Sequence, residues 1–132
     1  MASMRHALAA GTVAAAAALP SAAAAALPVD HGVFWNGSHN NGVSFTTTRH
    51  SVRDLQFFCD HTRYDLERPV TVHRDGTFSF SGRTRKYGRS GEPLGFYKAK
   101  VKGRFLSSKR VRMTRTLRGC DTATVRANGS RG

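Results

Sequence analysis

The sequence predicts an all-β protein: a single antiparallel β-sandwich or barrel-like domain of about eight strands with one disulfide. After residue 27, apolar residues recur at every second position, not at the three- and four-residue spacing of a helix. Turn-forming residues interrupt this alternation about every eight to twelve positions, as in sandwiches and barrels. We expect strands near Gly32–Asn36, Val43–Thr48, Leu55–Asp60, Val70–His73, Thr77–Ser81, Phe96–Phe105, Lys109–Leu117 and Thr122–Ala127.

The first 26 residues differ in composition from the rest, because fourteen of them are Ala. Arg5 and His6 precede an apolar run, Pro20 ends it, and small residues follow to Ala26, which is the layout of a secretory signal peptide. The run is shorter than the ~20 apolar residues of a membrane-spanning helix. We therefore expect a signal peptide over residues 1–26 and a secreted all-β domain over residues 27–132. That domain would be extracellular, either free or associated with the cell wall.

The expected mature chain holds two cysteines, Cys59 and Cys120. Export would place them in an oxidising compartment, where an even pair indicates a disulfide. Alternation puts Leu55, Phe57 and Cys59 on one face, so the bridge would pin two strands from the core side. The pattern leaves open whether the bridge is intramolecular. A Cys59–His61 pair is the alternative use of this thiol.

The strongest local turn signal is Asp75-Gly76, between two apolar segments. A three-residue loop, Arg74-Asp75-Gly76, would pair His73 with Thr77 and place Gly76 in the left-handed region. Val72 would then face Phe78, and Val70 would face Phe80, whereas a slip of one residue would reverse every face. The polar, Gly-rich segment Gly82–Gly95 is expected to be an exposed loop or a ragged edge strand. The tail after Ala127 is expected to fray.

Charge is concentrated in the second half of the chain. Residues 83–132 hold fifteen Lys and Arg against two Asp and Glu, whereas residues 27–82 hold five against six. Alternation in two successive expected strands directs apolar residues inward, and these are Tyr97, Ala99, Val101, Gly103, Phe105, Val111, Met113 and Leu117. Arg115 interrupts the inward row, so that strand is expected to bulge or to lie at an edge. The outward set forms a predicted anion-binding face of Lys98, Lys100, Lys102, Arg104, Arg110, Arg112 and Arg118.

A face this basic repels itself and attracts polyanions with a salt-dependent affinity. Arg outnumbers Lys 16 to 5, which suits bidentate contacts to phosphate. We therefore expect a secreted, non-catalytic binding protein for a polyanionic ligand. Candidate partners are a cell-envelope polymer, an anionic lipid headgroup, nucleic acid bound without sequence readout, or an acidic protein.

Two alternatives stay open. An envelope or structural protein of no specific ligand would carry the same charge as a solvated surface, and Arg, Ala and Gly share GC-rich codons. A small secreted ribonuclease-like hydrolase could use Glu67 or Glu92 with His73 as acid and base, and Arg83 or Arg85 on a phosphate. No G-x-S-x-G motif, Walker loop or close carboxylate pair supports an enzyme. No catalytic residue, metal site or cofactor is predicted.

Trp35 is the single tryptophan of the chain and has two interpretations. It could be a core residue of the first strand, or it could form a sugar-binding platform with nearby Asn residues and with Tyr64, Tyr87 and Tyr97. Five histidines lie after residue 27, without an HxH or HExxH arrangement, so they are expected to be surface residues.

Short motifs span nearly all of the expected mature chain. They are Gly32-x-Phe34/Trp35-x-Gly37, Val43-x-Phe45, Val52-x-x-Leu55-x-Phe57, Asp75-Gly76-x-Phe78-Ser79, Val101-x-Gly103-x-Phe105, and Cys120 before a Thr-rich last strand. In these motifs the chain resembles small secreted all-β proteins of actinobacteria with no established activity. The resemblance implies a secreted bacterial β-sandwich-like domain and carries over no catalytic residues. This chain is far more basic than that group.

Overall fold

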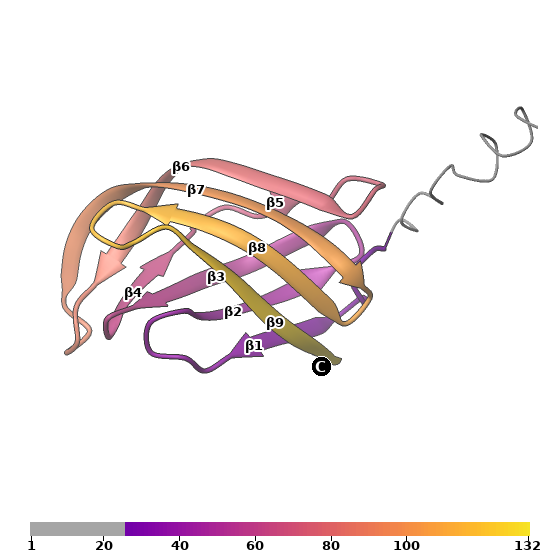
Figure 1. Cartoon of the computed structure of the whole chain (residues 1–132), viewed down its shortest axis with the longest axis horizontal. Helices are drawn as coiled ribbons and strands as arrows, with labels where there is room; N and C mark the ends of the chain where they lie inside the picture. Colours follow the sequence, from indigo (N-terminus) through magenta and orange to yellow (C-terminus); the bar gives the residue numbers. More distant parts are fainter. Residues whose placement is uncertain (1–25) are drawn as a thin grey trace, which may run out of the picture.

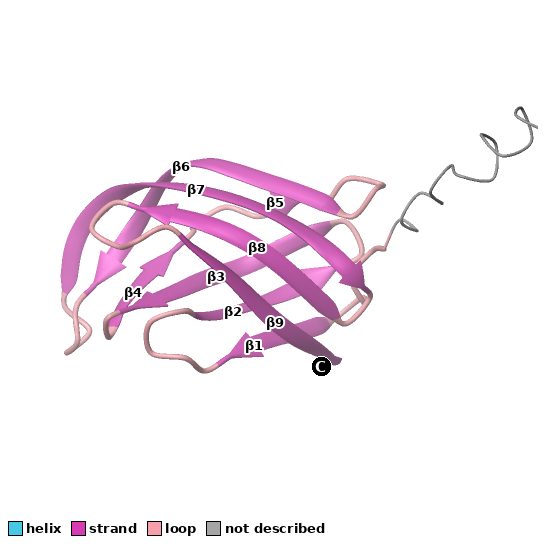
Figure 2. Cartoon of the chain, in the orientation of Figure 1, coloured by secondary structure: helices cyan, strands magenta, loops and turns pink. Residues whose placement is uncertain are grey.

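The structure, a computed structural model, describes residues 26–132, so the expected signal peptide lies outside the described residues apart from Ala26. The described part is all-β, as predicted, and contains only strands, turns and loops (Figure 2). Its strands are β1 (Gly32–Asn36), β2 (Gly42–Thr48), β3 (Ser51–Cys59), β4 (Thr62–Asp65), β5 (Val70–Thr71), β6 (Thr77–Tyr87), β7 (Pro93–Ser107), β8 (Arg110–Leu117) and β9 (Ala123–Arg131). Within residues 26–132, no helix is long and apolar enough to cross a membrane.

The strands form one antiparallel sheet that closes into a ring (Figure 1). Its order is β2-β1-β9-β8-β7-β6-β4-β3-β5, and β2 also pairs with β3. Of the two predicted architectures, the structure is therefore the barrel. Strand β5 pairs with β3 at Ser51 and Val52, on the same edge of β3 that β4 occupies further along, and it contacts β6. Most neighbours in the ring are also neighbours in the chain, so short antiparallel hairpins build most of it.

The interior of the barrel is filled by aromatic rings. Phe34 stacks on Phe45 with 4.8 Å between ring centroids, and Phe105 meets Phe34 edge-on at 5.5 Å. Two of the rings lie against a glycine of the neighbouring strand: Phe78 is paired with Gly103, and Phe34 is paired with Gly129. A Cβ at either glycine would overlap the ring. Large rings on one strand therefore lie opposite glycines on the next. This arrangement lets the side chains fill the interior of the barrel.

The C-terminal tail does not fray, contrary to the sequence prediction. Strand β9 continues to Arg131 and pairs with β1, from Gly32 opposite Arg131 to Trp35 opposite Asn128. The tail looks polar in sequence because its outward residues are polar and its inward residues, Ala127 and Gly129, are small. These small residues leave room for the rings of the core, so the tail becomes the strand that closes the barrel.

Segment Gly82–Gly95 is mostly strand, so the prediction of an exposed loop or ragged edge was wrong. Strands β6 and β7 pair from Thr77 opposite Arg104 to Tyr87 opposite Pro93, and only residues 88–92 turn between them. The segment has a hidden alternation, in which Thr84 is fully buried and its hydroxyl donates to the carbonyl of Tyr97. Because some inward residues near the end of the barrel are polar, the hydropathy pattern does not predict this strand.

Strand β4 was missed by the sequence reading. Cys59 pairs with Thr62, and the two residues between them, Asp60 and His61, both have positive φ. Such a two-residue turn with left-handed geometry at both positions normally carries Asn or Gly. Because Asp60-His61 lacks these residue types, the local sequence does not predict the β3–β4 hairpin.

The Asp75-Gly76 turn forms as predicted, but the strand before it pairs elsewhere. The amide of His73 donates to the carbonyl of Thr77 at 2.8 Å, and Gly76 has a φ of 82°. Strand β5 then joins β3, with Val70 opposite Val52, so the predicted Val72–Phe78 and Val70–Phe80 ladder was wrong. The physical reason is that β4 pairs with β3 only at residues 56–59, which leaves the same edge of β3 open at Ser51 and Val52, and this segment takes that edge.

Cys59 and Cys120 form an intramolecular disulfide, with 6.3 Å between their Cα atoms. It links the end of β3 to the connection between β8 and β9, at one end of the barrel. A bridge between residues 61 apart in sequence restricts the unfolded chain strongly.

We predict that the double variant Cys59→Ser/Cys120→Ser loses about 4 kcal/mol of unfolding free energy, by the loop-closure entropy of the unfolded chain. Urea denaturation followed by circular dichroism measures this loss. A reducing agent should lower the wild-type midpoint to that of the variant and leave the variant unchanged. Equal midpoints for oxidised wild type and variant would show that the bridge does not stabilise the fold.

Candidate functional site

The seven cations of the predicted face lie on the outer surface of two neighbouring strands and just beyond. On β7, Ala99, Val101 and Phe105 are buried, while the intervening Lys and Arg side chains are exposed. On β8, Val111, Met113 and Leu117 are buried in the same way. The predicted alternation is therefore confirmed in both strands. The exposed members are Lys98, Lys100, Lys102, Arg104, Arg110, Arg112 and Arg118, and we call them the cationic face.

The strand register places arginines side by side across three strands. Arg104 of β7 lies opposite Arg112 of β8, and Arg112 lies opposite Arg126 of β9. Adjacent strands are about 4.8 Å apart, so these three side chains leave the sheet in one row. Sequence reasoning missed Arg126, because the residue lies on β9 and only the register shows which residue of β9 faces Arg112.

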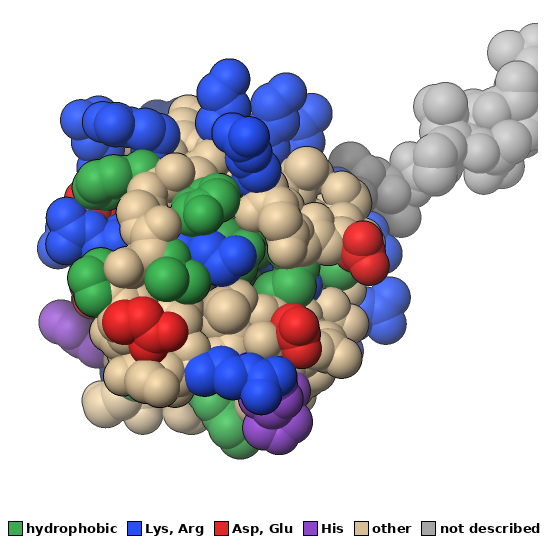
Figure 3. Space-filling view, turned by 90° about the vertical axis from the view of Figure 1, so that its left-hand side faces the viewer, with side chains coloured by type: hydrophobic (Ala, Val, Ile, Leu, Met, Phe, Trp, Pro, Cys, Tyr) green, Lys and Arg blue, Asp and Glu red, His purple; other side chains and the backbone are tan. Residues whose placement is uncertain are grey.

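Further cations extend the face toward β6, where Arg83 lies opposite Lys98. Seen from the end of the barrel in Figure 3, Lys and Arg side chains gather along the upper edge of the molecule. The extension ends at the exposed ring of Phe96, where Arg83 and Arg85 each lie 5.1 Å from the ring centroid. Arg85 also pairs with Glu67 at 3.1 Å, so this end is partly neutralised within the protein.

The cationic face itself takes part in none of the ion pairs among residues 26–132. Those pairs are Asp30–His31, Arg63–Asp65, Glu67–Arg85 and Asp60–Arg89. Asp75 lies within electrostatic range of Arg104, but its pKa is lowered first by hydrogen bonds from the Thr77 hydroxyl and amide and only weakly by Arg104. No carboxylate of the described residues therefore forms an ion pair with the row, and Asp75 acts on Arg104 only weakly.

The sequence predicts a bulge or an edge strand at Arg115, and this prediction was wrong. Arg115 is paired on both sides, with Val101 and with Ala123, and its side chain is 1% exposed. The guanidinium reaches the end of the barrel, where Nη1 donates to Cys120 Sγ at 2.9 Å and to the carbonyl of Asp121 at 3.2 Å. An inward charge is tolerated here because acceptors replace the water lost from the two Nη atoms, while the buried Nε has no hydrogen-bond partner among the described residues.

The second nitrogen of this guanidinium holds another loop. Nη2 donates to the carbonyl of Asn40 at 2.7 Å and to Asn41 Oδ1 at 3.2 Å, so Arg115 joins the β1–β2 loop to the β8–β9 connection. Burial lowers the pKa of Arg115, and the fields of Tyr64 and Asp121 oppose this shift. With its four hydrogen bonds, Arg115 acts as a cross-link beside the disulfide and is separate from the cationic face.

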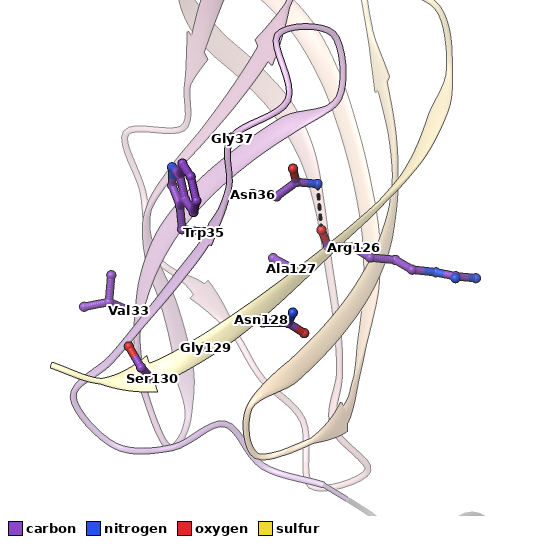
Figure 4. Close-up of a pocket in the computed structure, with 9 residues that line it drawn as sticks. All are labelled: Val33, Trp35, Asn36, Gly37, Arg126, Ala127, Asn128, Gly129 and Ser130. Carbon is purple, nitrogen blue, oxygen red and sulfur yellow. Dashed lines mark hydrogen bonds between the residues drawn. The ribbon is translucent and has the colours of Figure 1, made fainter.

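Trp35 is 66% exposed, so the interpretation as a core residue was wrong. It lies beside an open hollow of about 650 Å³ between β1 and β9 (Figure 4). The tyrosines proposed as its companions do not join it as a platform. Tyr64 is fully buried and packs edge-on against Tyr97, and the ring of Tyr87 lies under Arg63.

The residues of the hydrolase alternative are only partly brought together. Glu67 and Arg85 form an ion pair, whereas His73 lies at the other end of β6, beside Thr77. Eight residues of strand separate Thr77 from Arg85, which is roughly 25 Å. His39 and His61 lie close, with 4.8 Å between ring centroids, but no three His, Cys, Asp or Glu side chains of the described chain converge as a metal site would require.

We predict that Arg112→Glu raises the free energy of unfolding by about 1 kcal/mol at low salt, because two like-charge contacts with Arg104 and Arg126 become attractive. Arg112→Gln should give about half of this gain. Urea denaturation in low salt and in 1 M NaCl measures both variants, and salt should remove most of the gain. A loss of stability in Arg112→Glu would contradict the row of unpaired charges.

We predict that Arg115→Lys lowers the free energy of unfolding by about 3 kcal/mol, because one ammonium cannot hold both loops and buried acceptors lose charged hydrogen bonds. The matched control is Arg110→Lys on the same strand, which is exposed and should change stability by less than about 0.5 kcal/mol. Urea denaturation measures both. Equal effects of the two variants would refute the cross-linking role of Arg115.

No protein-family model, curated protein or solved structure matches this chain. The resemblance to small secreted all-β proteins of actinobacteria therefore stays a prediction from sequence. Function has to be inferred from the residues, charges and geometry of the barrel itself.

Proposed function

We propose that this protein is an exported, non-catalytic binding protein that uses the cationic face to hold a polyanionic ligand. The ligand class comprises cell-envelope polymers, anionic lipid headgroups and nucleic acid bound through its backbone. The observation that carries the proposal is the row of Arg104, Arg112 and Arg126, three exposed arginines in register without a carboxylate partner among the described residues.

Neighbouring positions argue that this row is more than an effect of overall composition. The next outward positions on β8 are Thr114 and Thr116, and Thr114 lies opposite Thr124 of β9. The outer surface of these strands therefore accepts neutral residues of high β-propensity. Placing three like charges in one row opposes folding, and a bound polyanion would relieve that repulsion.

The identity of the cations also supports a ligand with oxyanion groups. A guanidinium offers a planar pair of donors that matches phosphate and carboxylate oxygens. Parallel side chains on adjacent strands repeat this donor pair at the strand spacing of about 4.8 Å. A polymer with regularly spaced negative groups can occupy several such donors together, and each contact releases counterions.

We predict that Lys100→Glu/Arg104→Glu weakens binding of long-chain polyphosphate about tenfold or more at 0.15 M salt, because two contacts become repulsive. Both side chains are exposed on β7, so the fold should be retained, and Arg104→Glu would face Arg112 as an attractive pair. Isothermal titration calorimetry at several salt concentrations gives the affinity and its salt dependence.

The control variant is Arg49→Glu/Arg53→Glu, which changes the net charge equally but lies at the β2–β3 turn and on β3. It should keep most of the affinity. If both double variants lose affinity equally, binding follows net charge alone, and the protein is better described as an envelope or structural protein without a specific ligand. Binding that disappears at 0.15 M salt in the wild type would point the same way.

A further inference from the structure

Trp35 lies in the same cross-strand row as Arg110 of the cationic face, with one residue of β9 between them. Arg110 of β8 is paired with Asn128 of β9, and Asn128 is paired with Trp35 of β1. Outward side chains at paired positions leave the sheet side by side, about 4.8 Å apart. A charged donor, an amide and an aromatic ring therefore form one row across three strands, next to the row that contains Arg126.

The indole ring is held in position by the loop that follows it. A Cβ on Gly37 would overlap the six-membered part of the indole, so the ring packs against the backbone of Gly37. The loop is held in turn by Asn36, whose amide donates to the carbonyl of Arg126 at 2.8 Å and whose Oδ1 accepts from the amide of Ser38 at 3.1 Å. Trp35 is thus a pre-positioned aromatic surface, which lowers the entropy lost on binding.

Trp35 is unusually exposed for a large apolar side chain, which is typical of a residue that binds a ligand. Its side chain is 66% exposed, more than any other exposed large hydrophobic side chain of the described residues, which range from 44% to 49%. The hollow beside it opens where β1 and β9 stop pairing after Trp35 and Asn128. Figure 4 shows Trp35 on the β1 side of this hollow and Asn128 on the β9 side, while the side chain of Arg126 points away from Trp35.

The polar groups around the hollow are suited to hydroxyls. The side chains of Asn128 and Ser130 are exposed on β9 and make no hydrogen bond with any described residue, so their donors and acceptors are free for a ligand. An aromatic ring beside free amide and hydroxyl groups fits a pyranose, which has apolar C–H faces and a rim of hydroxyls. The adjoining arginines add affinity for negative groups on the same molecule.

We propose that the polyanion is an anionic glycan, one of whose pyranose rings stacks on Trp35 while its hydroxyls bind Asn128 and Ser130. Its carboxylate or phosphate groups would contact Arg110 and Arg126. This inference rests on the proposed function, because it names the ligand class of the cationic face. It also adds a second element, a sugar site beside the charged row.

A glycan fits this surface better than a nucleic acid does. Single-stranded nucleic acid is usually held by successive aromatic side chains, on which successive bases stack. The aromatic side chains that line a hollow with Trp35 are His39, Phe58 and His61, which lie toward β2 and β3 and not toward the cationic face. Toward the cationic face, the exposed aromatic side chain is Phe96. Phe96 lies at the far end of β7, eleven residues from the Ser107 that pairs with Arg110, which is roughly 35 Å along the strand.

The test uses the fact that Trp35 is the single tryptophan of the chain, so its fluorescence reports on this site alone. The full chain is titrated with hexagalacturonate, neutral maltohexaose, polyphosphate and the oligonucleotide dT8, and calorimetry follows each titration in parallel. Hexagalacturonate should shift the emission of Trp35, and its affinity should exceed that of maltohexaose about tenfold or more. Polyphosphate should bind by calorimetry without shifting the emission.

Variants separate the sugar site from the charged row. Trp35→Ala should weaken hexagalacturonate binding about tenfold or more in calorimetry, with polyphosphate binding unchanged. Gly37→Ala, which displaces the indole but keeps it, should weaken hexagalacturonate binding in the same direction. The matched control Phe96→Ala removes another exposed aromatic side chain and should leave both affinities unchanged.

The failures of the two proposals are distinguishable. Polyphosphate binding without any emission shift from hexagalacturonate would overturn the glycan inference and leave the proposed function standing. No binding of any polyanion in calorimetry would overturn both. If dT8 shifts the emission as strongly as hexagalacturonate and Trp35→Ala abolishes both, bases stack on Trp35 and the glycan assignment is wrong.

Discussion

The pairing of β9 with β1 is the interaction on which the rest of this structure depends. It closes the sheet, so that neither of these strands presents an unpaired edge to solvent. The closure works because Gly129 lies opposite Phe34, whose ring fills the space that a side chain on β9 would need. Once the ring is closed, each outward residue has a set neighbour on each side. The proximity of Arg112 to Arg126, and of Asn128 to Trp35, is a direct result of this register.

Arginine plays two opposed roles within one strand of this barrel. Arg115 points inward, and its four hydrogen bonds to loop acceptors and Cys120 join two connections at the end where the disulfide lies. Arg112, three positions earlier, points outward between two other arginines. The guanidinium of Arg115 is stabilised by acceptors at Nη1 and Nη2, although its buried Nε has no hydrogen-bond partner within residues 26–132. The charge of Arg112 is opposed by like charges on both sides. An exposed arrangement that opposes folding is understandable where a ligand uses it.

Several sequence predictions failed where pairing with a neighbouring strand, and not hydropathy, makes a segment a strand. The 82–95 segment and the tail are strands because their neighbours, β7 and β1, supply hydrogen bonds to a backbone whose side chains have little hydrophobic signal. Strand β5 pairs with β3 because β4 leaves the edge of β3 open at Ser51 and Val52. Trp35, which is apolar, faces outward because the alternation of β1 places Phe34 in the core. Hydropathy alone contains none of this information.

The sequence by itself determined the all-β class, the inward and outward faces of β7 and β8, the Asp75-Gly76 turn and the presence of a disulfide partner for Cys59. These depend on a two-residue period, a turn dipeptide and a pair of cysteines, all of which are local or countable. Only the tertiary structure decided that the sheet closes, that Arg126 joins Arg104 and Arg112, and that Trp35 stands beside them. The closure and the place of Trp35 depend on the pairing of β1 with β9, which are far apart in sequence. The place of Arg126 depends on the register of β8 with β9, and a slip of one residue would turn its side chain to the other face.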